Sequence, residues 1–276
     1  MGVRFPARLH VLLASQAPVG LVIRRGPAKA VCTILWDRER DQFQVGQWIR
    51  GRLYERRCDL SPDGRHLIYF AMNGKWQSET KGSWTAISRA PWLKAIVLYG
   101  KGDCWNGGGL FTSNDRYWLN GDCAHFLLHD SGELRRDTEF TPAGSYGGEC
   151  PSVYYRRLQR DGWVLKEHLT AGPTSGLTVF EKPLSDGWLL RKYAHAEVGA
   201  PPGKGCYWDE HELENLALNR RLKLPEWEWA EWDNEALVWA EGGKLHRAVL
   251  EAAGPAPPIV LHDFNGMQFM AREAPY

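Results

Sequence analysis

Three acidic residues of this 276-residue chain could do chemistry. Asp103, Glu149 and Asp209 each stand beside or close to a cysteine, at places that look equivalent in a repeated pattern. A glycoside hydrolase needs two carboxylates about 5–9.5 Å apart, which would lie beside aromatic side chains. The same acids could instead form a cation site or lie in solvated loops, and solvated loops are the simplest interpretation.

A second group of residues has the character of a recognition site. The segment 83–92 holds Arg89 between two tryptophans, and two more tryptophans flank the segment. Trp and Arg are enriched at binding hot spots, although a strand with inward Trp side chains and a solvent-exposed Arg is the simpler alternative. With the acids, the candidate binding residues are Trp76, Trp84, Arg89, Trp92, Asp103, Trp105, Glu149, Trp208 and Asp209.

Complete catalytic or metal-binding motifs do not emerge from the sequence. His125 and His129 are four apart, which on a strand separates their Cα atoms by about 13 Å, too far to chelate one ion. The stretch from His211 to Asn215 resembles a zincin motif but has Asn where the second His is needed. A serine-hydrolase elbow and a phosphate-binding glycine loop are likewise missing. We therefore expect no metal, no cofactor and no catalytic residue, and lean against an enzyme.

Bulk composition limits the partners. The 34 basic and 33 acidic residues give a formal net charge of +1, without the basic excess of a nucleic-acid binder. On strands, each Arg-Arg pair would put only one Arg on a given face; the pairs are 24–25, 56–57, 135–136, 156–157 and 220–221. A stretch of about 18 apolar residues is missing, so a membrane span is not expected. The six cysteines form no CxxC pair, which favours free thiols in a reducing cytoplasm.

The fourteen tryptophans are the compositional outlier. Trp suits half-buried sheet surfaces and packing between sheets, and this structural interpretation is preferred. The alternative is a platform on which sugars or peptides stack.

The fold class is predicted from the repeated alternation of turn dipeptides and short apolar runs. Asp-Gly or Asn-Gly occurs seven times and supplies the positive φ values of tight hairpin turns. The intervening runs predict strands over 9–13, 19–23, 31–36, 67–70, 84–88, 95–99, 153–157, 177–180, 236–239 and 259–262. An all-β protein is predicted.

A longer period suggests the architecture. Cys58, Cys104 and Cys150 are spaced evenly, 46 residues apart, close to the length of a four-stranded propeller blade. The stretch from Leu60 to Tyr69, which contains Ser-Pro-Asp-Gly-Arg, resembles the SPDG-type repeat of β-propellers. The resemblance implies a propeller architecture only, and carries over no functional residue. Blades of roughly 45 residues would divide residues 1–276 into five or six, in a single domain. A β-sandwich is the alternative.

Two segments are expected to depart from the repeat or to close it. Residues 209–222 predict a short helical insertion, because Asp209 can cap it, Glu212 has capping-box spacing and Pro225 ends it. Residues 267–272 are expected to form the last strand and to close the ring against the N-terminal part.

The function predicted from these observations is a non-enzymatic binding module that uses one propeller face for a protein or peptide partner. The alternative is a carbohydrate-active propeller, hydrolase-like or lectin-like, with an aromatic and acidic site and a glycan as ligand.

Overall fold

The computed structural model describes residues 5–26, 29–121, 124–144, 146, 149–170, 175–202 and 204–276. These residues divide into two compact units. Unit 1 consists of Met1–Leu9 and Leu158–Gly266, and unit 2 of His10–Arg157 and Met267–Tyr276. Each unit is described by itself.

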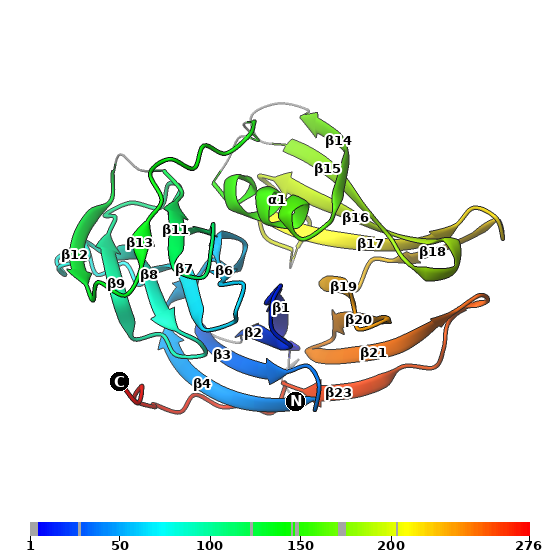
Figure 1. Cartoon of the computed structure of the whole chain (residues 1–276), viewed down its shortest axis with the longest axis horizontal. Coiled ribbons are helices and arrows are strands. Elements are labelled where there is room, and N and C mark those ends of the chain that lie inside the picture. Colours follow the sequence, from blue (N-terminus) through cyan, green and yellow to red (C-terminus); the bar gives the residue numbers. More distant parts are fainter. Residues whose placement is uncertain are drawn as a thin grey trace. The chain divides into compact units, whose positions relative to one another are not determined.

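Unit 2 is built on three sheets (Figure 1). The first has the order β1-β2-β3-β4, the second β12-β9-β8-β7-β5 with β6 also on β7, and the third β10-β11-β13. β2, β3 and β4 pair antiparallel, as do the strands of the second sheet and β10 with β11, whereas β11 and β13 are parallel. The strands are β1 (Arg8–Leu13), β2 (Val19–Arg25), β3 (Ala30–Asp37), β4 (Gln42–Arg50), β5 (Arg52–Leu53), β6 (Asp59–Leu60), β7 (His66–Met72), β8 (Ser83–Arg89), β9 (Ala95–Gly100), β10 (Gly109–Phe111), β11 (Arg116–Leu119), β12 (Phe126–Asp130) and β13 (Arg135–Arg136).

The middle sheet of unit 2 is buried on both faces. Along β7, Leu67 and Tyr69 join a core with residues of β1, β2 and β3, whereas Ile68 joins a second core with residues of β10 and β11. Successive strand residues point to opposite faces, so the three sheets of unit 2 pack face to face. This double burial explains why β7 reads as a continuous apolar run rather than an alternating one.

Unit 1 holds two further sheets, of orders β14-β15-β16-β17-β18 and β19-β20-β21-β22, with β23 also on β21. Both are largely meanders of neighbouring strands. The two-residue turn Asn234-Glu235 joins β19 to β20 with positive φ at both positions, as a type I′ hairpin requires. The strands are β14 (Val164–Thr170), β15 (Ser175–Pro183), β16 (Trp188–Glu197), β17 (Tyr207–Asn215), β18 (Arg220–Leu224), β19 (Trp229–Asp233), β20 (Ala236–Glu241), β21 (Lys244–Glu251), β22 (Gly254–Pro255) and β23 (Ile259–Asp263).

The prediction of an all-β protein is confirmed, since strands in five sheets dominate the described residues. The Ser-Pro-Asp-Gly turn also forms as predicted. The Asp63 carboxylate accepts the Ser61 hydroxyl at 2.6 Å and the Arg65 amide at 3.1 Å, and Gly64 has φ +75°. The turn connects β6 to β7.

The helix predicted over 209–222 is wrong. This segment forms most of β17, a turn and the beginning of β18. Residues 209–215 are buried except for Glu210, and a glutamate recurs at every second position, with Glu212 and Glu214 both paired with Arg191. A period of two is a strand pattern, and it outweighed the capping-box spacing.

The one α-helix among the described residues is α1 (Pro151–Arg160), where 153–157 were predicted to be a strand. Proline suits the first helical position, because its missing N–H would be unpaired there. Val153 and Tyr154 recur with Arg157 and Leu158 at spacings of three to five and are all buried, a helical period. Helical structure also corrects the assignment of two Arg-Arg pairs to strands, since 156–157 lie in α1 and 56–57 in a 3₁₀ turn.

Two further expectations need correction. Residues 267–272 form no strand, although the segment does run along β4 of the N-terminal sheet (Figure 1). The evenly spaced cysteines do not mark equivalent sites: Cys58 follows a 3₁₀ turn, Cys104 is exposed in a loop, and Cys150 is buried before α1. Cys123 lies outside the described residues.

Most of the tryptophans contribute to packing, in line with the structural interpretation that the sequence favoured. Seven of the fourteen are buried, namely Trp36, Trp163, Trp188, Trp208, Trp227, Trp229 and Trp239. Within the described part of the chain, no helix is both long and apolar enough to cross a bilayer.

Candidate functional site

The centre of the candidate site in unit 2 is a buried arginine. Arg57 ends the 3₁₀ turn Glu55–Arg57, and its side chain is 3% exposed. Its guanidinium donates to the carbonyls of Cys104 and Asn106, and lies 3.0 Å from a carboxylate oxygen of Glu149. Three segments far apart in the sequence are therefore fixed by one cation, in a geometry that the planar fork of arginine suits.

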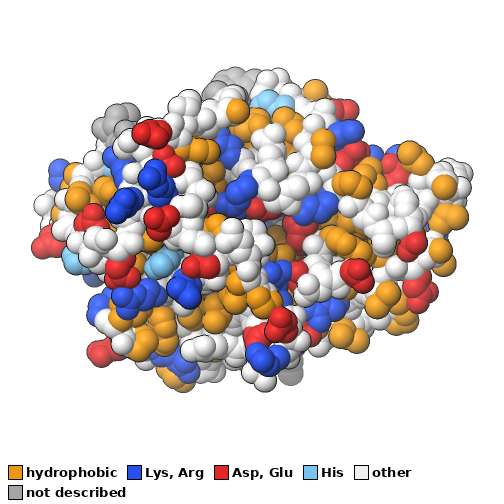
Figure 2. Space-filling model, in the orientation of Figure 1, with side chains coloured by type: hydrophobic (Ala, Val, Ile, Leu, Met, Phe, Trp, Pro, Cys, Tyr) orange, Lys and Arg blue, Asp and Glu red, His pale blue; other side chains and the backbone are white. Residues whose placement is uncertain are grey.

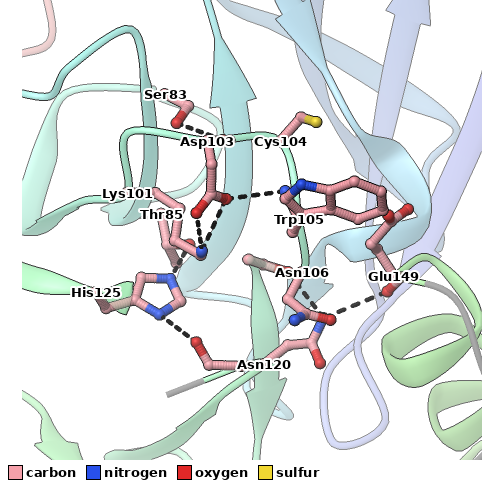
Figure 3. Close-up of polar contacts among 12 residues, drawn as sticks. Ser83, Thr85, Lys101, Asp103, Cys104, Trp105, Asn106, Asn120, His125 and Glu149 are labelled. Carbon is pink, nitrogen blue, oxygen red and sulfur yellow. Dashed lines mark hydrogen bonds and ion pairs between the residues drawn. The ribbon is translucent and has the colours of Figure 1, made fainter. Parts of the chain in front are cut away.

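The loop that Arg57 holds carries a second ion pair (Figure 3). Lys101 Nζ lies 2.8 and 2.9 Å from the two carboxylate oxygens of Asp103, and the lysine side chain is only 2% exposed. The same carboxylate accepts the main-chain N–H of Trp105 at 2.9 Å. Asp103 is thus occupied in shaping the loop, while about a third of its side chain stays exposed.

Glycines behind the loop allow two chain segments to approach closely. Gly108 has φ +73°, and a Cβ at this position would overlap the carbonyl oxygen of Arg57. A Cβ at Gly109 would overlap the carbonyl oxygen of Trp118. Only glycine fits at such contacts, so the loop is held in place by backbone packing as well as by charge.

His125 makes hydrogen bonds that support the same loop. Its Nδ1 donates to the carbonyl of Gly121 at 3.0 Å, and its Nε2 lies 2.8 Å from the hydroxyl of Thr85 (Figure 3). Thr85 also accepts the amide of Gly108. His125 is engaged with protein groups, and the described residues hold no cluster that could bind a metal ion.

Two tryptophans of this region remain open to solvent. Trp76 is 50% exposed and Trp105 is 63% exposed, whereas the other twelve are buried or half-buried. The Trp76 ring lies on Gly82, where a Cβ would come within 2.6 Å of it. Its exposed aromatic area is therefore supported from beneath by backbone.

A lysine and a phenylalanine lie on or against the segments that carry these tryptophans. Lys81 packs its aliphatic stem near Gly102, and its Nζ lies 5.1 Å from the ring centre of Phe126. These contacts run from Gly82, beside Trp76, to Gly102 in the loop of Trp105. We call Trp76, Lys81, Asp103, Trp105 and Phe126 the Trp76–Trp105 surface.

The remaining acids do not join Asp103 as a free catalytic set. Glu149 is paired with Arg57. Asp209 belongs to unit 1, and its fully buried side chain lies 4.0 Å from the ammonium of the equally buried Lys192. Asp209 is thus a structural counter-ion in a core, and the prediction that it binds a ligand has no support from its surroundings.

Trp208, also in unit 1, is another buried residue. It is 5% exposed and its ring stacks on His195, with centroids 4.5 Å apart and planes within 3°. A ring covered in this way offers no face to a sugar. Its expected role as a binding residue is therefore not supported.

The segment 83–92 is engaged within unit 2. Trp84 packs against the core and Trp92 is half-buried. Arg89 pairs with Glu133 at 2.8 Å and stacks over the ring of Tyr276, 4.7 Å from its centre. Arg89 does recognise an aromatic residue, but one supplied by the chain itself.

Sequence patterns did not indicate the residues that organise the site. In the sequence, Arg57 stands out only as half of an Arg-Arg pair, and Lys101, Lys81 and Phe126 are not among the predicted binding residues. A usable signal was Lys101-Gly-Asp, because a lysine two residues before an aspartate across a glycine can close an ion pair within one turn. For Arg57 no local signal exists, since its partners lie 47 to 93 residues away.

Comparisons with known proteins add little. No protein-family model matches the chain, and no curated protein matches it in sequence. Among solved structures, the crystal structure of Saccharomyces cerevisiae Sqt1 aligns with 96% of this chain and 88% of that chain, at 9% sequence identity and a TM-score of 0.26. A TM-score of this size supports no inference about fold or function.

Proposed function

We propose that the chain is a non-enzymatic binding module, which recognises a protein or peptide partner through the Trp76–Trp105 surface. The observation that carries the proposal is that the two solvent-exposed tryptophans lie in the same unit, Trp76 against Gly82 and Trp105 on the loop that Arg57 holds. Exposed Trp side chains of fixed conformation cost little entropy on binding and are typical interface anchors.

The charges of the surface suit a mixed polar and aromatic contact. Asp103 offers a partly exposed carboxylate that Lys101 already neutralises, and the exposed Lys81 offers a cation beside the ring of Phe126. Figure 2 shows charged side chains of both signs interspersed over the displayed face, in keeping with the net charge of +1. Such a surface favours a specific partner over nonspecific binding to a polyanion.

The architecture that we propose for the module is a β-propeller, with the five sheets of the described residues as its blades. Face-to-face packing of the three sheets of unit 2 and the meander order of the others support it. We further propose that residues 1–276 form a single domain located in the cytoplasm. One cooperative unfolding transition would support the single domain.

Affinity capture with matched variants tests the proposed function. Wild-type chain, the double variant Trp76→Ala/Trp105→Ala and the control Leu216→Ala are used as baits in native cell extract. Leu216 is 80% exposed and lies in unit 1, so its loss removes apolar surface elsewhere. We expect at least one protein that the wild type and the control retain and that the double variant loses by tenfold or more.

Direct binding must then reproduce the capture with purified components. Partners that all three baits retain equally would contradict the role of the surface. A glycan, the alternative ligand, is tested by treating the extract with glycosidases and by screening a glycan array. Capture that disappears on deglycosylation, together with Trp-dependent array binding, would replace the protein partner by a glycan.

A further inference from the structure

The segment 267–276 is held on the surface of unit 2 by three side chains. The first is Phe269, whose ring lies 5.9 Å from that of Trp48 and beneath the guanidinium of Arg50, 4.6 Å from its carbon. Trp48 and Arg50 both belong to β4. An aromatic side chain is thus received between a ring and a cation, a pairing that favours aromatic residues over aliphatic ones.

The second anchor is Arg272. Its guanidinium donates to the carbonyl of Val45 at 3.0 Å, and its own carbonyl accepts the side-chain amide of Gln47 at 2.8 Å. The oxygen of the same Gln47 amide accepts the main-chain N–H groups of Leu93 and Lys94 at 2.6 and 3.0 Å. Gln47 therefore recognises backbone of the segment while it is itself oriented by the 93–94 loop.

The third anchor is Tyr276. Its hydroxyl accepts the main-chain N–H of Arg89 at 3.0 Å and donates to the carbonyl of Lys94 at 2.7 Å. The side chains of Arg89 and Lys94 both lie over its ring, 4.7 and 5.5 Å from the centre. The surface contacts both the ring and the hydroxyl of Tyr276. Phenylalanine at this position would keep the cation–π contacts but lose both hydrogen bonds of the hydroxyl.

The way in which the segment is attached makes it exchangeable. β4 pairs with β3, and the described residues 267–276 add no strand to the outer edge of β4. Side-chain contacts at three points secure the segment instead. Such an attachment can be released without unfolding a sheet, in contrast to a strand within a ladder.

We propose that this surface, formed by Val45, Gln47, Trp48, Arg50, Arg89 and Lys94, is a second binding site that takes an extended peptide of a partner protein. The recognised pattern is an aromatic residue, an arginine three positions later and a tyrosine four positions after the arginine. The chain's own segment 267–276 occupies the site as a resident competitor. The inference uses a surface different from the Trp76–Trp105 surface and does not depend on it.

The test uses a fluorescent peptide of residues 265–276 as a ligand in trans for the full chain. A tethered segment competes at an effective concentration of about millimolar, so wild-type protein should bind the free peptide weakly. Arg272→Ala/Tyr276→Ala in the chain weakens the resident and should tighten peptide binding at least tenfold by fluorescence anisotropy. Adding Gln47→Ala to that double variant should reverse the gain.

Controls separate the proposal from its alternatives. A scrambled peptide should not bind. The milder variant Tyr276→Phe keeps the ring and should give an intermediate gain in peptide affinity. It replaces the double variant in the test if circular dichroism shows that the double variant is misfolded. Equal binding by wild type and both variants, or undiminished binding of the scrambled peptide, would overturn the proposal. Dimers that form by exchange of the segment, without peptide binding, would assign the surface to a second copy of the chain.

Discussion

The guanidinium of Arg57 lies 3.0 Å from the carboxylate of Glu149, across 92 positions of the sequence. The same arginine reaches the Cys104 and Asn106 carbonyls, so the exposed Trp105 stands on a loop that a buried cation fixes. A ligand that binds there meets a loop whose conformation is already set, and preorganisation of this kind lowers the entropy cost of binding.

Replacing this cation should destabilise the chain strongly. Arg57→Met should lower the free energy of unfolding by about 3–5 kcal/mol, since it leaves Glu149 and two carbonyls without their common donor. Glu149→Gln is the matched control. It keeps the shape and an acceptor oxygen and should cost only about 1 kcal/mol. Urea unfolding followed by Trp fluorescence measures both, and equal losses would contradict the central role of Arg57.

Close packing around the loop predicts a contrast between two glycines. Gly108 and Gly132 both have positive φ, but a Cβ at Gly108 would overlap the Arg57 carbonyl, whereas nothing lies within 4 Å of one at Gly132. Gly132→Ala should cost about 1 kcal/mol of backbone strain. Gly108→Ala should cost several kcal/mol more or prevent folding. Similar melting temperatures for the two variants would show that the contact at Gly108 yields easily.

The buried aspartate of unit 1 should prove structural. Asp209→Ala removes a buried carboxylate beside the ammonium of Lys192, whose side chain is 1% exposed, and should cost about 3–5 kcal/mol. Glu210→Ala, one position away with a side chain 39% exposed, should stay within about 0.5 kcal/mol of wild type. Thermal unfolding of both variants is the measurement. A stable Asp209→Ala protein with impaired partner binding would return Asp209 to the list of binding residues.

Thiol reactivity should divide the described cysteines into two classes. Cys104 and Cys206 are exposed and should react with iodoacetamide in the native protein. Cys32, Cys58 and Cys150 are buried and should react only after unfolding. Burial raises the pKa of Cys32 to about 12, and it also raises the pKa of Cys58 and of Cys150, so that little reactive thiolate forms. Peptide mapping by mass spectrometry resolves each site, and native labelling of Cys58 would contradict the packing described.

Stability should fall in mild acid partly because of His66. Burial lowers the pKa of His66 below its ordinary value of 6.5, which outweighs the opposite effects of Asp63 and Glu133. As the pH falls through about 6.5, His66 is therefore protonated in the unfolded chain but stays neutral in the folded chain. The contribution of neutral His66 is complete above that pH and is lost as the pH falls toward the folded value.

The variant His66→Gln isolates this effect. The difference in unfolding free energy between pH 7.5 and pH 5 should be smaller in His66→Gln than in wild type, because glutamine does not titrate. Urea unfolding at both pH values gives the comparison. An identical pH dependence of the two proteins would show that other groups, such as His262, account for the acid sensitivity.

Local sequence determined most strands and the tight turns of this protein. The short β-type runs in 84–88 and 67–70 specify strands, because strand propensity and turn chemistry act over a few residues. The Ser61–Gly64 turn formed as predicted for the same reason: the hydrogen bonds of Ser61 with Asp63 and His66 join residues at most five positions apart. Local rules failed where two patterns competed, as in 209–222, where a capping-box spacing overlay an alternation of period two.

The candidate site and the bound segment were decided by tertiary structure alone. The role of Arg57 depends on two carbonyls and a carboxylate that only the folded chain brings close to it, and no residue near position 57 in the sequence indicates these partners. Arg89 was flagged as a recognition residue from its neighbours, yet its aromatic partner, Tyr276, is 187 positions away. Exposure divided the tryptophans in the same way: their types were evident, but only packing left Trp76 and Trp105 in solvent, because burial is a property of the whole fold.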